Sequence, residues 1–218
     1  MFKLFKTKRK WSKTTSSEGR FSFRVFTDAH LFSKYNDNKE LYETIRLAPN
    51  DGRTVLLGDI VDRACCKLSD LPEATRFMQM LVKRFGDAYV FGNHERSGIN
   101  ILVYIITLPD GRRAGFTHND LLGDYDKWFK YRHKPAGASW LKRRTVMFLD
   151  TLDWLKAQRP IPEKYFTNAL ALMEENNLDV LIGGHYHVAT PRFYEDSTTG
   201  YKKEIFTLPA HQDNRIWV

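Results

Sequence analysis

Two stretches set the expected architecture: Thr54-Val55-Leu56-Leu57-Gly58-Asp59-Ile60-Val61-Asp62-Arg63 and Tyr89-Val90-Phe91-Gly92-Asn93-His94-Glu95. Each is a short apolar run that stops at a glycine and continues into polar side chains able to bind metal. The pattern of residues 71–85 between them predicts a helix, so the unit is expected to be strand, helix and parallel strand. Open α/β sheets place their sites at the carboxyl ends of parallel strands. We therefore expect four side chains to converge: Asp59, Asp62, Asn93 and His94.

The remaining sequence predicts further strands that end at similar residues. Residues 21–26 alternate and are followed by Asp28 and His30. Residues 101–108 and 113–117 flank a turn and predict a hairpin that runs into His118. A buried strand over residues 178–182 runs into Gly184-His185-Tyr186-His187. The other expected elements are helices over residues 39–47 and 165–177, and strands over residues 190–194 and 204–208.

Length and composition predict one main domain. With 218 residues and 42% hydrophobic content, the chain can bury a sizeable core. We expect a tail over residues 1–20, a single domain over residues 21–218, and a helical aromatic and basic insertion over residues 121–162 that alternatively serves as a cap. No internal repeat or linker marks a second domain.

The net charge of +8 is concentrated in the tail, where seven basic residues stand against Glu18 alone. We expect this tail to be disordered and solvated, with binding to nucleic acid or an anionic membrane surface as the alternative. The longest apolar run, residues 99–108, is too short for a transmembrane segment. Two adjacent cysteines, Cys65 and Cys66, form no disulfide framework, which favours a reducing cytoplasm.

Five of the seven histidines lie at or just beyond an expected strand end. A single histidine in a polar loop is more often a surface residue than a ligand, but five so placed, beside four Asp or Asn residues, predict a site. Imidazole and carboxylate ligands without cysteine suit divalent Zn, Mn, Fe or Ni. The histidines are His30, His94, His118, His185 and His187, and the others are Asp28, Asp59, Asp62 and Asn93.

These residues carry a family resemblance. In order, Asp28-x-His30, Gly58-Asp59-x-x-Asp62-Arg63, Gly92-Asn93-His94-Glu95, His118 and Gly184-His185-x-His187 resemble the five signature blocks of the calcineurin-like metallophosphoesterases. The resemblance spans about residues 27–187. It implies an α/β fold of four layers, α-β-β-α, in which two mixed β-sheets pack together with helices outside.

The resemblance also implies a binuclear metal centre and a phosphoester hydrolase. Two divalent ions (Mn, Fe, Zn or Ni, with Mn expected in vitro) would lower the pKa of a bridging water and give a hydroxide that attacks phosphorus. Asp59 is the bridging candidate because its two oxygens can be shared. One ion would take Asp28, Asp59, His30 and His187, and the other Asp59, Asn93, His118 and His185.

Three further residues have implied catalytic roles. His94 would donate a proton to the leaving oxygen, Asp62 would orient it, and Arg63 would bind the phosphate. Alternatively, Asp62 and Arg63 pair only with each other, and Asn93 forms a turn. His133 in the insertion, with Arg132, Arg143 and Arg144, is a weak substrate-contact candidate, and the insertion's aromatics alternatively fill core.

The blocks leave the substrate open. The second and third blocks are similar to phosphoprotein phosphatases and bis-nucleoside tetraphosphatases, although Ala64 and Asn119 depart from that pattern. His118-Asn119-Asp120 and the insertion resemble UDP-diacylglucosamine hydrolases, which often carry Arg where this chain has His94. A phosphomonoester or a pyrophosphate is thus expected. A phosphoesterase-fold scaffold that binds a protein is the non-enzyme alternative.

Overall fold

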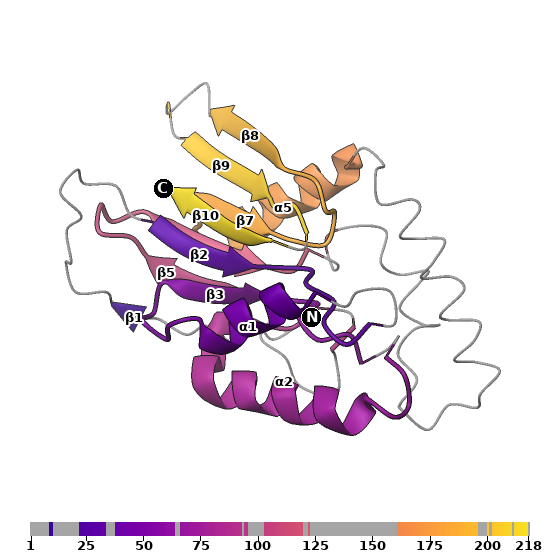
Figure 1. The fold of residues 1–218 in the computed structure, drawn as a ribbon. Coiled ribbons are helices and arrows are strands. Elements are labelled where there is room, and N and C mark those ends of the chain that lie inside the picture. Colours follow the sequence, from indigo (N-terminus) through magenta and orange to yellow (C-terminus); the bar gives the residue numbers. More distant parts are fainter. Residues whose placement is uncertain are drawn as a thin grey trace.

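The computed structural model describes residues 9–10, 22–33, 38–63, 66–92, 94–95, 103–119, 122, 161–195, 200, 202–210 and 212–217. Their strands form two sheets, shown in Figure 1. The larger has the order β1-β5-β6-β7-β9-β8 and the smaller the order β10-β2-β3-β4. Both sheets mix parallel and antiparallel neighbours, as the resemblance implies.

In the larger sheet, β6 (Arg113–Thr117), β7 (Val180–Gly183) and β9 (Lys202–Thr207) are parallel neighbours. Antiparallel strands flank them: β5 (Tyr104–Thr107) pairs with β6, and β8 (Thr190–Glu195) pairs with β9. The carboxyl ends of β6, β7 and β9 therefore lie at the same end of the sheet.

In the smaller sheet, β2 (Ser22–Phe26), β3 (Thr54–Leu57) and β4 (Tyr89–Val90) run parallel. The edge strand β10 (Asp213–Trp217) pairs antiparallel with β2. A 3-10 turn, η1 (Gly86–Ala88), joins the second helix to β4. The order of elements along β3, the helix and β4 is the strand, helix and parallel strand that the sequence predicts.

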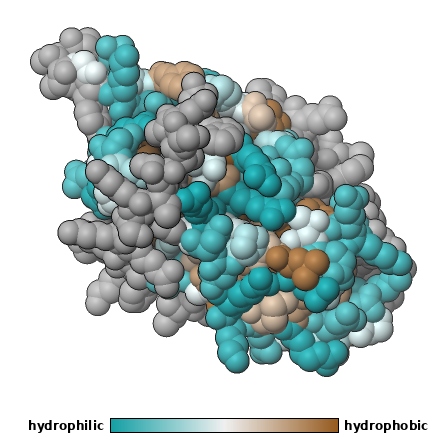
Figure 2. Space-filling model, turned by 60° about the vertical axis from the view of Figure 1, so that its left-hand side comes forward, coloured by the Kyte–Doolittle hydropathy of each residue, from teal (hydrophilic) through white to brown (hydrophobic). Residues whose placement is uncertain are grey.

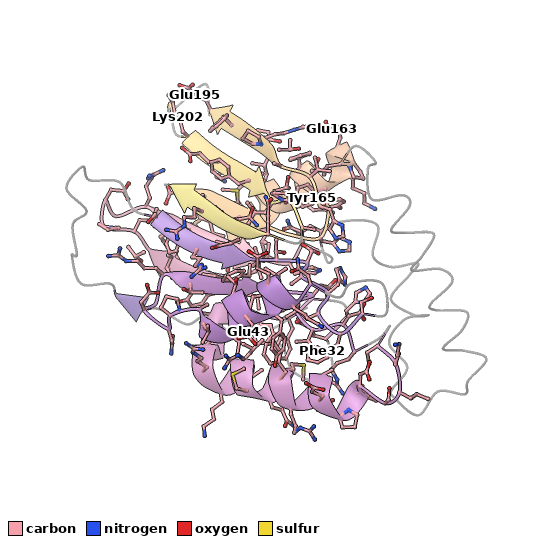
Figure 3. The ribbon with its side chains drawn as sticks, viewed as in Figure 1. Phe32, Glu43, Glu163, Tyr165, Glu195 and Lys202 are labelled. Carbon is pink, nitrogen blue, oxygen red and sulfur yellow. The ribbon has the colours of Figure 1, made fainter. Side chains whose placement is uncertain are left out.

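Three apolar clusters hold the layers together. Side chains of both sheets meet in the first, where the rings of Phe23 and Phe116 lie 5.1 Å apart between centroids. In the second, α1 (Lys39–Leu47) and α2 (Leu71–Phe85) cover the outer face of the smaller sheet. In the third, α5 (Glu163–Asn176) covers the larger sheet, and Tyr165 is part of this contact (Figure 3). The four-layer prediction is therefore confirmed.

Local signals explain where the helices begin and end. The side chain of Asn38 accepts a hydrogen bond from the Leu41 amide at the start of α1. Pro72 lies in the first turn of α2, where a missing amide hydrogen costs nothing, and Gly86 follows its last residue. Asn177 takes the left-handed conformation, with φ of 51°, after α5.

Most predicted elements are present, and two strands were missed. Helix α1 and helix α2 have the predicted bounds, the hairpin and the strand before Asp28 are confirmed, and α5 begins two residues early. Strand β10 was missed because Asp213-Asn214-Arg215 is polar and the strand lies at a sheet edge.

The structure describes two residues of the tail. Strand β1 (Arg9–Lys10) pairs with β5, whose outer edge offers unpaired backbone groups. The disorder of the tail stays a prediction. The rest of the tail and residues 123–160 of the insertion lie outside the described residues.

Figure 2 shows a largely hydrophilic face with apolar residues in small separate areas. Among the described residues, the exposed large apolar side chains are Leu47, Leu68, Val82 and Phe193. Within the same described ranges, no helix combines the length and apolar character needed to cross a membrane.

Candidate metal centre

Loops that follow five parallel strands bring the predicted site residues together. Asp28 and His30 follow β2, Asp59 and Asp62 follow β3, and His94 follows β4. From the larger sheet, His118 follows β6, and His185 and His187 follow β7. Five of these residues have positive φ angles, a strained conformation for non-glycine residues that clusters at functional sites. The angles are 49° at Asp28, 45° at His30, 51° at Asp59, 72° at His185 and 56° at His187.

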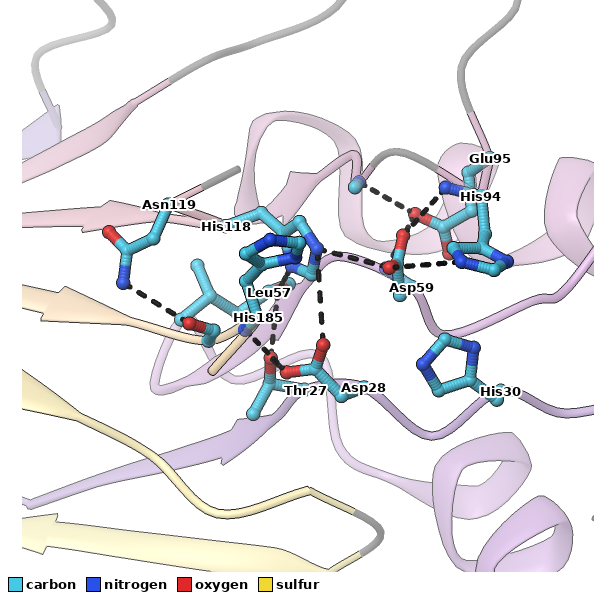
Figure 4. A network of polar contacts seen from close by, with 12 residues as sticks. Thr27, Asp28, His30, Leu57, Asp59, His94, Glu95, His118, Asn119 and His185 are labelled. Carbon is cyan, nitrogen blue, oxygen red and sulfur yellow. Dashed lines mark hydrogen bonds and ion pairs between the residues drawn. The ribbon is translucent and has the colours of Figure 1, made fainter. Parts of the chain in front are cut away.

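One group of possible ligands joins the two sheets: Asp28, Asp59, His118 and His185, with one ligand atom of each within 4.8 Å of the others. Nε2 of His118 lies 3.1 Å from Oδ2 of Asp59 and 3.9 Å from Oδ1 of Asp28. The opposite ring nitrogen, Nδ1, lies 3.0 Å from the carbonyl oxygen of Leu57 (Figure 4). A histidine that donates Nδ1–H to a carbonyl presents a lone pair at Nε2, as metal-binding histidines do.

A second group consists of Asp28, His30 and His187. Nε2 of His187 lies 3.2 Å from Oδ1 of Asp28, and the rings of His30 and His187 lie 5.8 Å apart. Asp28 thus belongs to both groups, whereas the ligand sets implied by the family resemblance share Asp59. The other oxygen of Asp28 accepts hydrogen bonds from the Thr27 hydroxyl at 2.5 Å and the His185 amide at 2.8 Å.

Asp62 connects the imidazoles of His30 and His94. Its Oδ1 lies 3.0 Å from Nδ1 of His94, and its Oδ2 lies 3.5 Å from Nδ1 of His30. Nε2 of His94 lies on the side of the two groups of possible ligands, 4.0 Å from Oδ2 of Asp59. One carboxylate can therefore orient both rings, and the three residues also form a possible ligand group.

The electrostatics of the site keep the carboxylates charged. Burial opposes the ionisation of Asp28, Asp59 and Asp62, but nearby imidazoles outweigh it and lower their pKa values below the usual range. The imidazoles differ from one another. Burial, together with the adjacent His118, lowers the pKa of His185 to about 3. Burial also disfavours the charged form of His187, but the hydrogen bond and the negative charge of Asp28 favour that form more, so the pKa of His187 is raised.

These features fit divalent cations. The ligand atoms are carboxylate oxygens and imidazole nitrogens, and the pKa of about 3 keeps His185 neutral, the form that binds metal. Oδ1 of Asp28 is buried and has no hydrogen-bond partner among the described residues, although His187 lies close. A cation between such groups would satisfy the oxygen and neutralise two adjacent buried carboxylates.

The structure also shows supporting residues for which sequence reasoning gave no role. Glu95 accepts hydrogen bonds from four backbone amides and from Tyr89, and Asn119 donates to the Gly184 carbonyl at 3.3 Å. Glu95 belongs to the Gly92-Asn93-His94-Glu95 block, and Asn119 follows His118, so adjacency to ligands was the available signal. Their partners are backbone groups of distant segments, which sequence alone does not reveal.

Other predicted residues are placed only in part. Arg63 is half-buried next to Asp62. The ligand candidate Asn93 lies outside the described residues, as do the four weak substrate candidates, His133, Arg132, Arg143 and Arg144. Their roles stay predictions.

Comparison with known proteins places the site in a family. The family model for calcineurin-like phosphoesterases matches residues 21–189, the span that carries all the converging side chains. The chain belongs to this family. In this calcineurin-like phosphoesterase, the Asp and His cluster is thus a candidate centre for divalent metals.

Solved structures with a similar chain path include other phosphoesterases. The first is a predicted phosphoesterase from Streptococcus pneumoniae, at 13% identity and a TM-score of 0.44, over 91% of this chain and 83% of the other. A dimetal phosphatase from Danio rerio has 16% identity and a TM-score of 0.40, over 88% of each chain.

The calcineurin-like phosphoesterase also resembles vacuolar protein sorting 29 from Cryptosporidium parvum, at 10% identity and a TM-score of 0.43, over 88% of this chain and 75% of the other. No curated protein sequence matches it. All three TM-scores are below 0.5.

Proposed function

We propose that this protein is a metal-dependent phosphoester hydrolase. The observation that carries the proposal is the cluster of Asp28, Asp59, His118 and His185, in which two buried carboxylates and two imidazoles direct ligand atoms to a common point. When bound, two divalent cations supply Lewis-acid activation of water and neutralise charge on the phosphoryl oxygens. Manganese is the proposed ion in vitro.

The chain contributes rigid ligands. His118 is held by the Leu57 carbonyl, and Asp28 is held by Thr27 and the His185 amide, so neither ligand needs to reorganise when a cation binds. We assign Asp28, His30, Asp59 and His187 to one ion and Asp59, Asn93, His118 and His185 to the other. The place of Asp28 in both geometric groups makes it a second candidate for the shared position.

His94 is the proposed general acid. Its Nδ1 lies 3.0 Å from Oδ1 of Asp62, which orients the ring, and its Nε2 points toward the proposed metal ligand Asp59. A proton held at Nε2 is therefore positioned for the leaving oxygen of a bound phosphoester. Arg63, next to Asp62, is proposed to bind the phosphate through its planar guanidinium.

The substrate proposal is a phosphomonoester, on a protein or a nucleotide-like molecule, or a pyrophosphate. A UDP-diacylglucosamine-type pyrophosphate, bound under the aromatic and basic segment, is the alternative. The tail's net positive charge keeps nucleic acid and anionic membranes as proposed accessory partners, and a cytoplasmic location stays a proposal from the two adjacent cysteines.

The test is turnover by metal-loaded protein. With added Mn²⁺, the protein should hydrolyse p-nitrophenyl phosphate or its bis ester, and Asp59→Asn should lower kcat/KM at least about a thousandfold because a ligand and a negative charge are lost. Asp179→Asn is the matched control, since Asp179 accepts an amide hydrogen bond from Arg113 at the other end of the sheet. Absence of turnover with Mn²⁺, Fe²⁺, Zn²⁺ and Ni²⁺ would contradict the proposal.

Two further measurements separate the alternatives. A panel of phosphopeptide, nucleotide and lipid-sugar-nucleotide substrates distinguishes a monoesterase from a pyrophosphate hydrolase. Metal analysis tests the scaffold, for which well under one metal ion per chain is expected, against about two for the hydrolase.

A further inference from the structure

Glu95 is a buried carboxylate with an unusual number of hydrogen-bond donors. It is 1% exposed. Its Oε2 accepts from the amides of Asp59 at 3.1 Å and Gly92 at 3.0 Å. Its Oε1 accepts from the amides of Ile60 at 2.7 Å and Val61 at 2.9 Å, and also from the Tyr89 hydroxyl. Five donors saturate the acceptor positions of an ionised carboxyl group.

The four amide donors come from two loops that carry proposed site residues. Three of the amides follow β3, in the segment that contains Asp59 and leads to Asp62, and the fourth follows β4, one residue before Asn93. Glu95 itself follows His94 directly. One side chain therefore joins the two loops, and Figure 4 shows Glu95 beside Asp59.

Asp59 needs such support. Its φ of 51° is strained for a residue with a side chain, at a cost of order 1–3 kcal/mol, and persists only where neighbouring contacts enforce it. The loop after β4 also passes very close to it, because a Cβ at Gly92 would lie 2.1 Å from Oδ1 of Asp59. The same Oδ1 accepts the His94 amide at 2.8 Å.

An amide cannot replace this carboxylate. A glutamine offers one acceptor oxygen and one NH₂ group, so the NH₂ would face either the Asp59 and Gly92 amides or the Ile60 and Val61 amides. Two buried donors would lose their acceptor, and burying unsatisfied donors costs about 1–3 kcal/mol each. The loops would then separate, while the apolar clusters around them stay packed.

We propose that Glu95, supported by Tyr89, is a positioning residue that holds the backbone of Asp59 in its metal-binding conformation. The inference rests on the metal centre of the proposed function. Glu95 touches no substrate or metal ligand atom in this role, and it acts through the Asp59 amide and the adjacent turn.

The test measures metal affinity rather than activity. Full-length protein freed of metal by chelation is titrated calorimetrically with Mn²⁺ alone. Glu95→Gln should weaken Mn²⁺ binding about 10–100-fold, the usual effect of losing a group that orients a ligand. Tyr89→Phe removes one hydrogen bond but keeps the ring that packs against Phe91, and it should weaken binding about threefold.

The control is Asp179→Asn, which also replaces a carboxylate by an amide, but at the opposite end of the sheet. The asparagine oxygen can still accept the hydrogen bond from the Arg113 amide, so Mn²⁺ binding should stay within twofold of the parent. A general effect of losing one negative charge would affect the control and Glu95→Gln alike. In Glu95→Gln only, hydrogen exchange at the amides of Asp59, Ile60, Val61 and Gly92 should also become faster.

Binding by folded Glu95→Gln within twofold of the parent would overturn the inference, and so would equal losses in the control. If Glu95→Gln does not fold, Tyr89→Phe decides: unchanged Mn²⁺ affinity overturns the inference. A parent that binds no Mn²⁺ overturns it together with the proposed centre. A parent that binds Mn²⁺ without hydrolysing any phosphoester defeats only the proposed reaction.

Discussion

The two ends of the β-sheets differ in where their charged side chains lie and in which residues take positive φ angles. At the carboxyl ends of β2, β3, β6 and β7, buried carboxylates lie among imidazoles and non-glycine residues take positive φ angles. At the other end, the turn between β5 and β6 has its positive φ at Gly111, and its charged residues Asp110 and Arg112 pair in solvent. Glu195 and Lys202 likewise lie 4.0 Å apart at the tips of β8 and β9 (Figure 3).

The difference shows where the fold tolerates strain. At the turn end, a glycine adopts the positive φ angle without strain and water solvates the charges, so the free-energy cost is small. At the site end, buried charges and strained backbone angles carry a free-energy cost that apolar packing alone does not compensate. Such strain is expected where a ligand offsets it. Substitutions of the same kind at the two ends should therefore have very different consequences.

The largest difference is expected in catalysis. His94→Asn should lower kcat about 10²–10⁴-fold while about two Mn²⁺ ions still bind, because asparagine keeps a polar side chain but cannot transfer a proton. Asp110→Asn at the turn end should leave kcat unchanged. Steady-state kinetics with an aryl phosphate, together with metal analysis, checks both. A kcat for His94→Asn within threefold of the parent would remove His94 from the reaction.

A smaller difference is expected in the pH dependence of stability of the metal-free protein. The pKa of His185 is about 3 in the folded chain, and an ordinary histidine has 6.5. Between these values the unfolded chain binds a proton that the folded chain does not, so stability falls as the pH falls. The contribution is up to about 2 kcal/mol between pH 7 and 5.

Urea unfolding of the parent and of His185→Asn at both pH values measures this contribution, which the variant should lack. The variant removes the need to correct for His187, whose raised pKa acts in the opposite direction in both proteins. Equal pH slopes in the two proteins would contradict the prediction.

The smallest effect is expected at the turn end. Arg112→Ala removes the contact with Asp110 at 2.7 Å and the longer contact with Glu204 at 3.6 Å. Because these groups are solvated, the free energy of unfolding should fall by less than about 1 kcal/mol, with no change in Mn²⁺ affinity. Thermal unfolding checks the first and calorimetry the second. A fall in the free energy of unfolding as large as that expected for removing a buried charged group would contradict the proposed difference between the two ends.

Much of the site end could be predicted from sequence. Alternation and short apolar runs located β2, β3, β4 and β7, and the residues that follow each strand were candidate ligands because parallel strands end at one edge. The polar edge strand β10 and the two-residue strand β1 were missed, since each forms by pairing with a strand distant in sequence. Periodicity does not report such pairing.

The supporting contacts were also beyond sequence reasoning. Glu95 binds amides 34 to 36 residues away, and Asn119 binds a carbonyl 65 residues away. Their partners are backbone groups, which are the same in every residue and leave no trace in residue type.

By itself, the order of amino acids predicted the main strands and helices and the candidate ligands at the strand ends, because hydrophobic period and side-chain chemistry are local properties. The four-layer architecture was implied by the resemblance of the signature blocks to a known family. Only the tertiary structure decided that Asp28 belongs to two ligand groups, that Asp62 serves two imidazoles and that Glu95 joins two loops. These depend on distances of a few ångströms between separate strands, which arise when the two sheets pack.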